Sequence, residues 1–383
     1  MESLTLDHFR GFKKFSMEGL RPVNLLVGTN NSGKTSVLEA IQLLCAEGDP
    51  SALRQTMTRR GEQFFGANED SGHVSQELDV RHLFFERALE QGSKCVVTSH
   101  GDGDDRWISY EVKKSIEGDF HEDSQNLLFE NEDENDDLGS LIGERLVVEV
   151  AGSSIPTAVR FPLSHKGGLS LRSSPMRFRV EAGMGPRIRE ANAPVRFLGT
   201  ESFSPGYLRS QWDDIVLTQQ EQFVIKALEI LEPVERIAFL GVDRAYYRGT
   251  SHGGVLVKIS GMDSPVPIGS MGEGMWRLLV LAICVVRSAG GTLLVDEIDT
   301  GLHHTVIADM WKLVVTTAKQ LDVQIFATTH SLDCVRSLAA VIRNEEIPAD
   351  SVCIQRVEKE TQQSVRYSDR EIVIASERDT EVR

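Results

Sequence analysis

The sequence predicts an α/β fold in which a mixed central sheet is interrupted by a large α+β insertion, and three observations lead to this prediction. A glycine-rich loop at residues 28–35 follows an apolar run at 23–27 and precedes a helical pattern that starts at Val37. A second apolar run, residues 291–295, ends in two adjacent carboxylates. Between these parts, the regular alternation of apolar strands and amphipathic helices breaks down over a long stretch.

The length of the chain supports this division. With 383 residues, the chain is longer than one growing hydrophobic core usually supports. We expect residues 1–47 and 233–383 to form the two parts of one α/β domain. We expect residues 48–232 to form the insertion. It would contain the rest of the lobe that begins with the N-terminal strands, and an arm that projects from that lobe.

Composition excludes several classes of protein. A net charge of -16 argues against a uniformly basic surface for nucleic acid, although it does not exclude a local basic patch. The five cysteines lack C-x-x-C spacing, which predicts packed, reduced thiols and no disulfide framework or zinc site. The chain opens with Met1-Glu2-Ser3-Leu4, unlike an export signal, and its most apolar window contains Arg287. We therefore expect a cytoplasmic protein.

Residues 4–10 alternate between apolar and polar side chains, turn at Gly11 and are followed by a second strand pattern at 15–20. This predicts an antiparallel pair ahead of the glycine-rich loop. Arg10 ends the first strand. It would lie near the loop if the pair stacks beside it, and a solvated arginine at a strand end is the alternative.

The loop itself, Gly28-Thr29-Asn30-Asn31-Ser32-Gly33-Lys34-Thr35, fits the phosphate-binding pattern G-x-x-x-x-G-K-[ST] between a strand and a helix. Backbone N–H groups of the turn and the helix N-terminus can surround phosphate oxygens there. Lys34 would reach the β- and γ-phosphates of ATP, and the Thr35 hydroxyl would bind Mg²⁺. The residues expected around the nucleotide are Gly28, Asn30, Asn31, Ser32, Gly33, Lys34, Thr35 and Ser36.

The insertion is predicted to be compact, because it shows no repeat and no sustained heptads. Residues 78–89 look helical, and the apolar runs at 94–98, 107–112 and 146–150 look like strands separated by turns.

Two charged segments stand out in the insertion. Residues 117–137 hold acidic side chains without a single Lys or Arg, which favours a disordered, solvated loop over a cation site. Further along lies an arginine cluster whose face could contact phosphates or an acidic partner, or could simply be solvated or paired internally. Its members are Arg172, Arg177, Arg179, Arg187, Arg189 and Arg196.

The regular alternation of apolar strand patterns and amphipathic helix patterns returns from residue 235. Strand patterns occupy 236–240 and 255–259, and Ser270-Met271-Gly272-Glu273-Gly274 precedes an apolar helix at 275–286. Near the C-terminus, residues 351–357 form a strand pattern with a hairpin partner around Val365, and a charged helix follows.

The apolar run 291–295 delivers Asp296 and Glu297 at its C-terminal end, where open α/β sheets place ligands. Asp296 suits the Mg²⁺ shell, directly or through water, and Glu297 suits a general base that orients water. A solvated turn that merely ends a strand is the alternative for this pair.

A third strand pattern, 323–327, is followed by Thr328-Thr329-His330-Ser331. His330 therefore reaches the same sheet edge, where we favour phosphate sensing over a core histidine. His303 and His304 are adjacent and face different ways on a helix, so we expect a helix-start or turn role for them.

Taken in order, these motifs resemble an ABC-class ATPase head. The resemblance rests on the phosphate loop, the Ser-x-Gly-x-Gly segment at 270–274, the Asp-Glu strand end, the run Ile298-Asp299-Thr300-Gly301-Leu302-His303-His304, and Thr-Thr-His-Ser. More narrowly, it resembles the SMC/RecF-like branch and, within it, ATPases related to the overcoming-lysogenization-defect (OLD) family. It covers residues 1–44 and 235–338 well and the insertion poorly.

This resemblance implies a head-to-head dimer that sandwiches two ATP molecules and hydrolyses them with Mg²⁺. Ser270 and Gly272 would meet the nucleotide of the partner subunit, and Asp299 would lie in the loop that crosses the dimer interface and couples the sites. The glutamine of the family's glutamine loop is not assigned, because Gln63, Gln76 and Gln91 are all candidates.

OLD-type nucleases add a metal-dependent Toprim domain after the ATPase head, and no such domain is recognisable after His330. The resemblance therefore implies an ATPase that acts with a separately encoded nuclease or toxin effector, in prokaryotic antiphage defence or a related toxin module. For the ATP-bound dimer, assembly into a higher oligomer stays open. The alternative function is a RecF-like clamp that closes on DNA with ATP in recombination or repair, although Gly272-Glu273-Gly274 and Gly301-Leu302-His303 depart from the RecF pattern.

Overall fold

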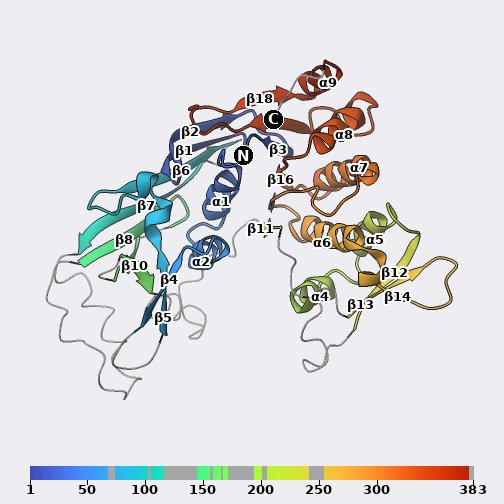
Figure 1. Cartoon of the computed structure of the whole chain (residues 1–383), viewed down its shortest axis with the longest axis horizontal. Helices are drawn as coiled ribbons and strands as arrows, with labels where there is room; N and C mark the ends of the chain where they lie inside the picture. The colour runs from blue at the N-terminus through green and yellow to red at the C-terminus, as the bar shows by residue number, and fades with distance from the viewer. Residues whose placement is uncertain are drawn as a thin grey trace. The chain divides into compact units, whose positions relative to one another are not determined.

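The computed structural model describes residues 1–67, 74–101, 105–115, 145–155, 158–164, 167–170, 194–200, 205–240 and 254–378. The chain divides into two compact units (Figure 1). Unit 1 comprises Met1–Leu4, Phe15–Cys45 and Arg189–Arg383, and unit 2 comprises Thr5–Lys14 and Ala46–Ile188. The sequence placed the end of the insertion at residue 232, whereas unit 2 ends at Ile188.

Unit 1 is organised around a six-stranded sheet with the order β11-β15-β16-β3-β17-β18. The first five strands run parallel and β18 is antiparallel to β17, so the sheet is mixed, as the sequence predicted. The strands are β3 (Val23–Val27), β11 (Val195–Leu198), β15 (Thr292–Val295), β16 (Gln324–Thr328), β17 (Val352–Arg356) and β18 (Val365–Ser368).

Helices cover both faces of this sheet (Figure 1). The helix α1 (Lys34–Cys45) packs on β11, β15 and β16. The other face carries α6 (Glu273–Arg287), α7 (His304–Gln320) and α8 (Leu332–Arg343), while α9 (Asp369–Glu377) packs on α8, β17 and β18. Every residue of β3 and β15 is buried, as expected for parallel strands covered on both sides.

The helical layer owes much of its stability to large side chains. Trp276 of α6 is 1% exposed and Trp311 of α7 is 0% exposed. Burying one large apolar side chain contributes roughly 1.5–3 kcal/mol, so α6 and α7 give the sheet a rigid backing. This rigidity matters because the strand ends that carry Asp296 and Glu297 start from the same core.

A smaller antiparallel sheet, β12-β13-β14, also belongs to unit 1. The strands β12 (Val234–Phe239) and β13 (Val255–Ile259) confirm the predicted strand patterns, and β14 (Val266–Pro267) pairs with β13. A 3₁₀ helix, η5 (Ile268–Met271), leads into α6. The helices α4 (Pro205–Asp213) and α5 (Glu221–Leu228) pack on α6, which explains why they belong to unit 1 although the sequence assigned them to the insertion.

Two further sheets have the orders β2-β1-β6-β7-β8-β9 and β10-β5-β4. Their strands belong to unit 2, except that the first two residues of β1 and the last four of β2 are assigned to unit 1. The first hairpin and the three strands expected in the insertion are confirmed. The strands of these two sheets are β1 (Ser3–Phe9), β2 (Phe12–Glu18), β4 (Gln63–Ala67), β5 (Val74–Asp79), β6 (Lys94–His100), β7 (Arg106–Ser115), β8 (Arg145–Gly152), β9 (Val159–Pro162) and β10 (Gly168–Ser170). Among the described residues, α2 (Pro50–Arg59) forms an α-helix of unit 2.

The helix expected at 78–89 is wrong. Leu78 and the preceding residues of β5 pair with β4, and two short 3₁₀ helices follow, η1 (Val80–Leu83) and η2 (Phe85–Arg87). Phe84 between them is extended and bridges Phe9 of β1. The buried spacing of Leu78, Val80 and Leu83 looked helical, but pairing with distant strands outweighs that local preference.

Several predictions fall on residues outside the described ranges: the acidic segment 117–137 and all of the arginine cluster except Arg196. Arg196 lies in β11, and its Nε donates to the Arg287 carbonyl at 2.9 Å. All five cysteines are buried thiols that form no disulfide, which confirms the prediction of packed thiols.

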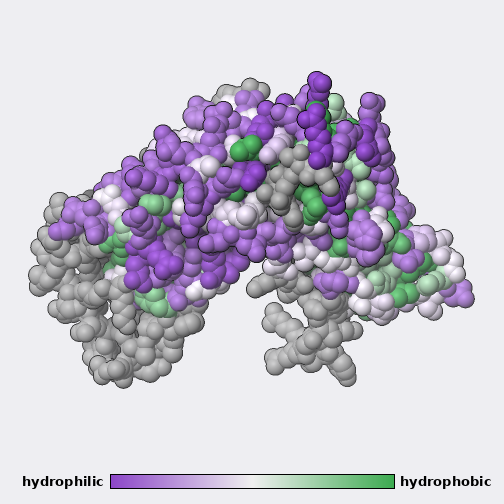
Figure 2. All heavy atoms as spheres, turned by 45° about the horizontal axis from the view of Figure 1, so that its top comes forward, coloured by the Kyte–Doolittle hydropathy of each residue, from purple (hydrophilic) through white to green (hydrophobic). Residues whose placement is uncertain are grey.

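The surface drawn in Figure 2 is mostly hydrophilic, with small scattered groups of hydrophobic residues. Met262 is 48% exposed and Leu240 is 41% exposed, and such isolated apolar residues are normal on a protein surface. In the described part of the chain, no helix combines the length and hydrophobicity that crossing a membrane requires.

Candidate nucleotide site

The phosphate loop of unit 1 joins the buried strand β3 to α1, as the sequence predicted. Gly28 has φ 142°, and a Cβ there would lie 2.4 Å from the carbonyl oxygen of Val357. Gly33 has φ 103° and Asn31 has φ 63°, so three residues of the loop lie at positive φ. Glycine and asparagine tolerate this region best, and the resulting turn brings backbone N–H groups close together at the start of α1.

Lys34 lies at the first position of α1 and is only 5% exposed. Its Nζ donates to the carbonyl oxygens of Gly28 at 2.8 Å and Thr29 at 2.9 Å. Burial lowers the pKa of Lys34, while the charges of Asp296 and Glu297 oppose that shift. The ammonium group is therefore held against the loop by backbone carbonyls and faces two carboxylates.

Thr35 and Asp296 lie close together in the structure although they are far apart in the sequence. The Thr35 Oγ1 lies 3.2 Å from Asp296 Oδ2 and 3.3 Å from Oδ1. A hydroxyl and a carboxylate are the oxygen ligands that Mg²⁺ takes from protein beside nucleotide phosphates. In the same loop the Ser32 hydroxyl oxygen is buried and has no hydrogen-bond partner among the described residues. The residues present thus fit a magnesium-bound nucleotide.

Thr328, the last residue of β16, holds the end of β15 in place. Its Oγ1 donates to Asp296 Oδ1 at 2.6 Å and accepts the Glu297 N–H at 2.8 Å. The parallel register of the two strands brings these residues level with one another. Thr328 is not among the predicted site residues, although its place in Thr328-Thr329-His330-Ser331, directly after the strand pattern, was a usable signal.

Glu297 adopts φ 51°, the left-handed region that non-glycine residues avoid. Its Oε2 accepts a hydrogen bond from Thr300 Oγ1 at 3.0 Å. Its backbone carbonyl accepts one from Arg277 of α6 at 3.0 Å. The carboxylate is half-buried at the edge of the sheet beside Asp296, in the same unit as Lys34 and Thr35.

Asp299 and His330 follow the same two strands. Asp299 Oδ1 accepts a hydrogen bond from Thr329 Oγ1 at 2.7 Å, so the two threonines donate to the carboxylates of Asp296 and Asp299. His330 is exposed, and the next residue, Ser331, caps α8 by accepting the Cys334 N–H at 3.2 Å. The roles of His330 in phosphate sensing and of Asp299 at a dimer interface stay predictions.

Ser270 and Gly272 are both exposed at the junction of η5 and α6. Gly272 is the N-cap of α6 and has φ 90° with ψ 165°, a conformation that favours glycine. The expected contact of these residues with a partner's nucleotide stays a prediction.

The helix-start role expected for the His303-His304 pair is confirmed. His303 is the N-cap of α7, and its side chain accepts the Thr305 N–H.

The described ranges bring no group of three or more His, Cys, Asp or Glu side chains together as a metal site. Mg²⁺ commonly takes one or two carboxylates from the protein and its other ligands from substrate phosphates and water. Asp296, together with the Thr35 hydroxyl, can supply the protein ligands of such a site.

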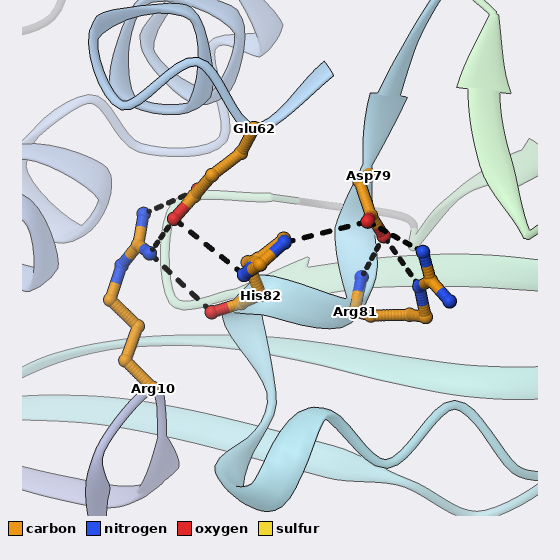
Figure 3. A network of polar contacts seen from close by, with 5 residues as sticks. All are labelled: Arg10, Glu62, Asp79, Arg81 and His82. Atoms are coloured by element: carbon orange, nitrogen blue, oxygen red, sulfur yellow. Dashed lines mark hydrogen bonds and ion pairs between the residues drawn. The ribbon is translucent and has the colours of Figure 1, made fainter. Parts of the chain in front are cut away.

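Arg10 lies in unit 2, where its side chain is 6% exposed (Figure 3). Its Nη1 and Nη2 donate to the two carboxylate oxygens of Glu62 at 2.6 Å and 3.0 Å. Nη1 also lies 3.4 Å from the carbonyl oxygen of His82. The structure therefore shows Arg10 in a buried ion pair, and its predicted contact with the nucleotide stays a prediction.

Two families match parts of the chain. The family described as "AAA ATPase domain" matches residues 1–142, and the family described as "AAA domain, putative AbiEii toxin, Type IV TA system" matches residues 220–334. The first match contains the phosphate loop. The second contains the Ser270–Gly272 segment, Asp296, Glu297 and His330.

Among curated relatives, an ATP/GTP phosphatase of Helicobacter pylori is 17% identical over 372 residues, which cover 90% of this chain and 89% of that protein. The DNA replication and repair protein RecF of Acinetobacter baumannii is 49% identical over 108 residues, covering 21% of this chain and 30% of RecF. Among solved structures, an Smc head domain from Pyrococcus furiosus is 13% identical with a TM-score of 0.43, covering 99% of both chains. That structural similarity is too low to bear on the function.

The comparisons agree with the geometry of unit 1. The site has a phosphate loop with Lys34, and it holds the Thr35 hydroxyl beside the Asp296 carboxylate. The same chain has two matches to AAA-type families and aligns along most of its length with an ATP/GTP phosphatase. The chain is therefore an ATPase, two parts of which match AAA-type domain families.

Proposed function

We propose that this protein hydrolyses ATP with Mg²⁺ at the unit 1 site and uses the hydrolysis to gate a separate effector. The observation that carries the catalytic part is the contact between Thr35 and Asp296, 3.2 Å apart, with Lys34 and Glu297 in the same unit. P-loop NTPases bring together the same combination of loop hydroxyl, loop lysine and strand-end acid.

Each residue has a physical task in this proposal. Thr35 and Asp296 hold Mg²⁺, which when bound neutralises charge on the phosphate oxygens. Lys34 supplies a positive charge to the same oxygens, and N–H groups at the start of α1 add to it. Glu297 accepts hydrogen bonds from the attacking water and takes its proton. Thr328 keeps Asp296 and Glu297 oriented through its two hydrogen bonds.

The test of the catalytic assignment is Glu297→Gln, which keeps the shape of the side chain and removes its basicity. We expect kcat for ATP hydrolysis to fall on the order of 10²-fold or more while the affinity for ATP is retained. Glu346→Gln is the matched control, because Glu346 pairs with Lys312 on the surface of the same unit. If Glu297→Gln hydrolyses ATP as fast as the parent, Glu297 is not the general base.

The proposal includes a dimer in which ATP joins two heads. Ser270 and Gly272 are exposed beside the N-terminus of α6, a position where backbone N–H groups favour an anion. Asp299 follows the catalytic strand end and would couple the two sites across the interface. The expected result is an ATP-dependent dimer of the Glu297→Gln protein in sedimentation, lost in Gly272→Trp; a monomer in both states contradicts it.

The biological part of the proposal is an ATPase of the SMC/RecF-like branch, related to OLD proteins, that controls a nuclease or toxin in cytoplasmic antiphage defence. The match of residues 220–334 to a family described by a toxin and a toxin–antitoxin system supports it. A nucleotide-gated partner must bind the ATP-bound and free states unequally. Pull-downs with Glu297→Gln protein should therefore recover the effector in one nucleotide state, and recovery in neither state would overturn this part.

A RecF-like DNA clamp is the second candidate, supported by the 49% identity to RecF over 108 residues. Several phosphate contacts would make DNA affinity fall steeply with salt. ATP-dependent DNA binding with such a salt dependence would favour this reading. No binding to DNA with ATP at low salt would remove it.

A further inference from the structure

Arg277 is a buried cation in the otherwise apolar helix α6. It lies between Trp276 and Leu278 and is 6% exposed. Burial lowers the pKa of its guanidinium, while Cys284, Asp299, Glu297 and Asp296 oppose the shift. A buried cation costs free energy unless it is fully engaged, so its position in the core requires an explanation.

The guanidinium of Arg277 binds three backbone carbonyls at the ends of two parallel strands. Nη1 donates to Gly199, just after β11, at 2.9 Å. Nη2 donates to Asp296 at 3.2 Å and to Glu297 at 3.0 Å, both just after β15. Its Nε is buried without a hydrogen-bond partner in the described part of the chain. Nη1 and Nη2 of Arg277 are therefore hydrogen-bonded to the two strand ends, whereas Nε has no such bond among the described residues.

The acidic turn is where the backbone departs from favourable geometry. Glu297 at φ 51° is strained relative to an ordinary conformation, and such residues persist only where their surroundings over-determine them. Two groups do so here: Thr328 accepts the Glu297 N–H and Arg277 donates to its carbonyl. The peptide units before and after the Glu297 Cα are thus each pinned, which fixes the direction of its side chain.

We propose that Arg277 is a positioning residue for ATP hydrolysis, which holds the left-handed backbone of Glu297 so that its carboxylate meets the attacking water. The inference rests on the proposed role of Glu297 as the general base. Arg277 acts through backbone carbonyls. A displacement of a catalytic group by about 1 Å can cost on the order of 10²-fold in rate, so loss of these hydrogen bonds from Arg277 is expected to lower kcat.

The experiment compares Arg277→Lys and Arg277→Gln with the parent protein. Lysine keeps the charge but cannot bridge three carbonyls in a plane, and glutamine keeps two donors without the charge. We expect kcat to fall by about 10-fold to 100-fold in both variants, with the Kd for a fluorescent ATP analogue changed by less than about 3-fold. Arg287→Lys, at the other end of α6 and paired with Asp214, is the control and should leave kcat unchanged.

A double-mutant cycle separates positioning from general support of the fold. If Arg277 acts through Glu297, adding Arg277→Lys to Glu297→Gln lowers kcat by less than about 3-fold further. If the two effects multiply, if kcat is unchanged, or if neither Arg277 variant folds by circular dichroism, the positioning role is overturned. A parental kcat in Glu297→Gln alone is a different result, because it rejects the general base itself.

Discussion

The Thr35 hydroxyl lies 3.2 Å from Asp296 Oδ2, although 261 residues separate them in the sequence. The contact arises because β3 and β15 both flank β16 in a parallel sheet, so their C-terminal ends reach one edge. Thr328, at the end of β16 itself, lies between them in the sheet and bonds Asp296. The site is thus assembled by strand order, and its precision depends on hydrogen bonds between strand ends.

Thr328→Val should impair both hydrolysis and stability. The exchange keeps the shape of the side chain and leaves the Glu297 N–H and Asp296 Oδ1 without the Thr328 hydroxyl. We expect kcat to fall about 10-fold or more and the free energy of unfolding to fall by about 1–3 kcal/mol. Thr328→Ser keeps the hydroxyl and serves as the control. Equal activity of the valine and serine variants would show that these bonds do not orient the carboxylates.

Lys34→Ala should abolish activity without destabilising the protein. A hydrogen bond to a charged group contributes about 1.5–3 kcal/mol, so ATP binding is expected to weaken by about 10-fold to 100-fold. Because burial disfavours the charged form of Lys34, its removal should leave the Tm of the nucleotide-free protein unchanged or higher. Calorimetric titration with ATP and thermal unfolding measure the two effects. Lys312→Ala, on the surface of α7, is the matched control.

Much of the fold could be predicted because its strands are short apolar runs with clear ends. β3, β15, β16 and β17 all appear where the sequence expects them, and their parallel order brings the predicted acids to the loop. The segment 78–89 could not be predicted, since its buried residues fit a helix and only pairing with β4 and Phe9 decides otherwise. Such long-range pairing leaves no local signature.

The sequence points to the carboxylates of the candidate site and does not point to Arg277 and Thr328, which support them. Asp296 and Glu297 are visible as carboxylates at a strand end. Arg277 binds backbone carbonyls, and Thr328 binds the Glu297 N–H and the Asp296 carboxylate. No sequence pattern indicates which of these groups a side chain reaches. The usable signal for Arg277 was a single cation inside an apolar helical run, a placement that is costly without partners.

Glu62→Ala should destabilise unit 2 strongly. The side chains of Arg10 and Glu62 are 6% and 9% exposed, and removing one partner of a buried ion pair costs about 3–5 kcal/mol. Glu111→Ala is the control, because the Lys94–Glu111 pair is far more exposed and should contribute less than about 1 kcal/mol. Urea denaturation followed by circular dichroism compares the two. A loss below about 1 kcal/mol for Glu62→Ala would mean that Arg10 finds another partner.

Asp79 should make the stability of unit 2 depend on pH in the acid range. Its carboxylate accepts hydrogen bonds from Arg81 Nε and Nη2, both at 2.7 Å, and Nε2 of His82 lies 3.4 Å away (Figure 3). Burial acts to raise the pKa of Asp79, but the hydrogen bonds and charges of Arg81 and His82 outweigh it, so the pKa is lowered from 3.8.

A lowered pKa in the folded state means that the ionised carboxylate stabilises the fold. The stabilisation is complete at pH values above 3.8 and is lost as the pH falls through the lower pKa of the folded protein. Asp79→Asn keeps a cap for η1 and removes the titration. The parent should therefore be more stable than Asp79→Asn at pH 6, by about 1 kcal/mol or less because Arg81 is half exposed, and the difference should shrink below pH 3.8. Urea denaturation of both proteins across this range checks it, and a difference that grows on acidification would reverse the assigned sign.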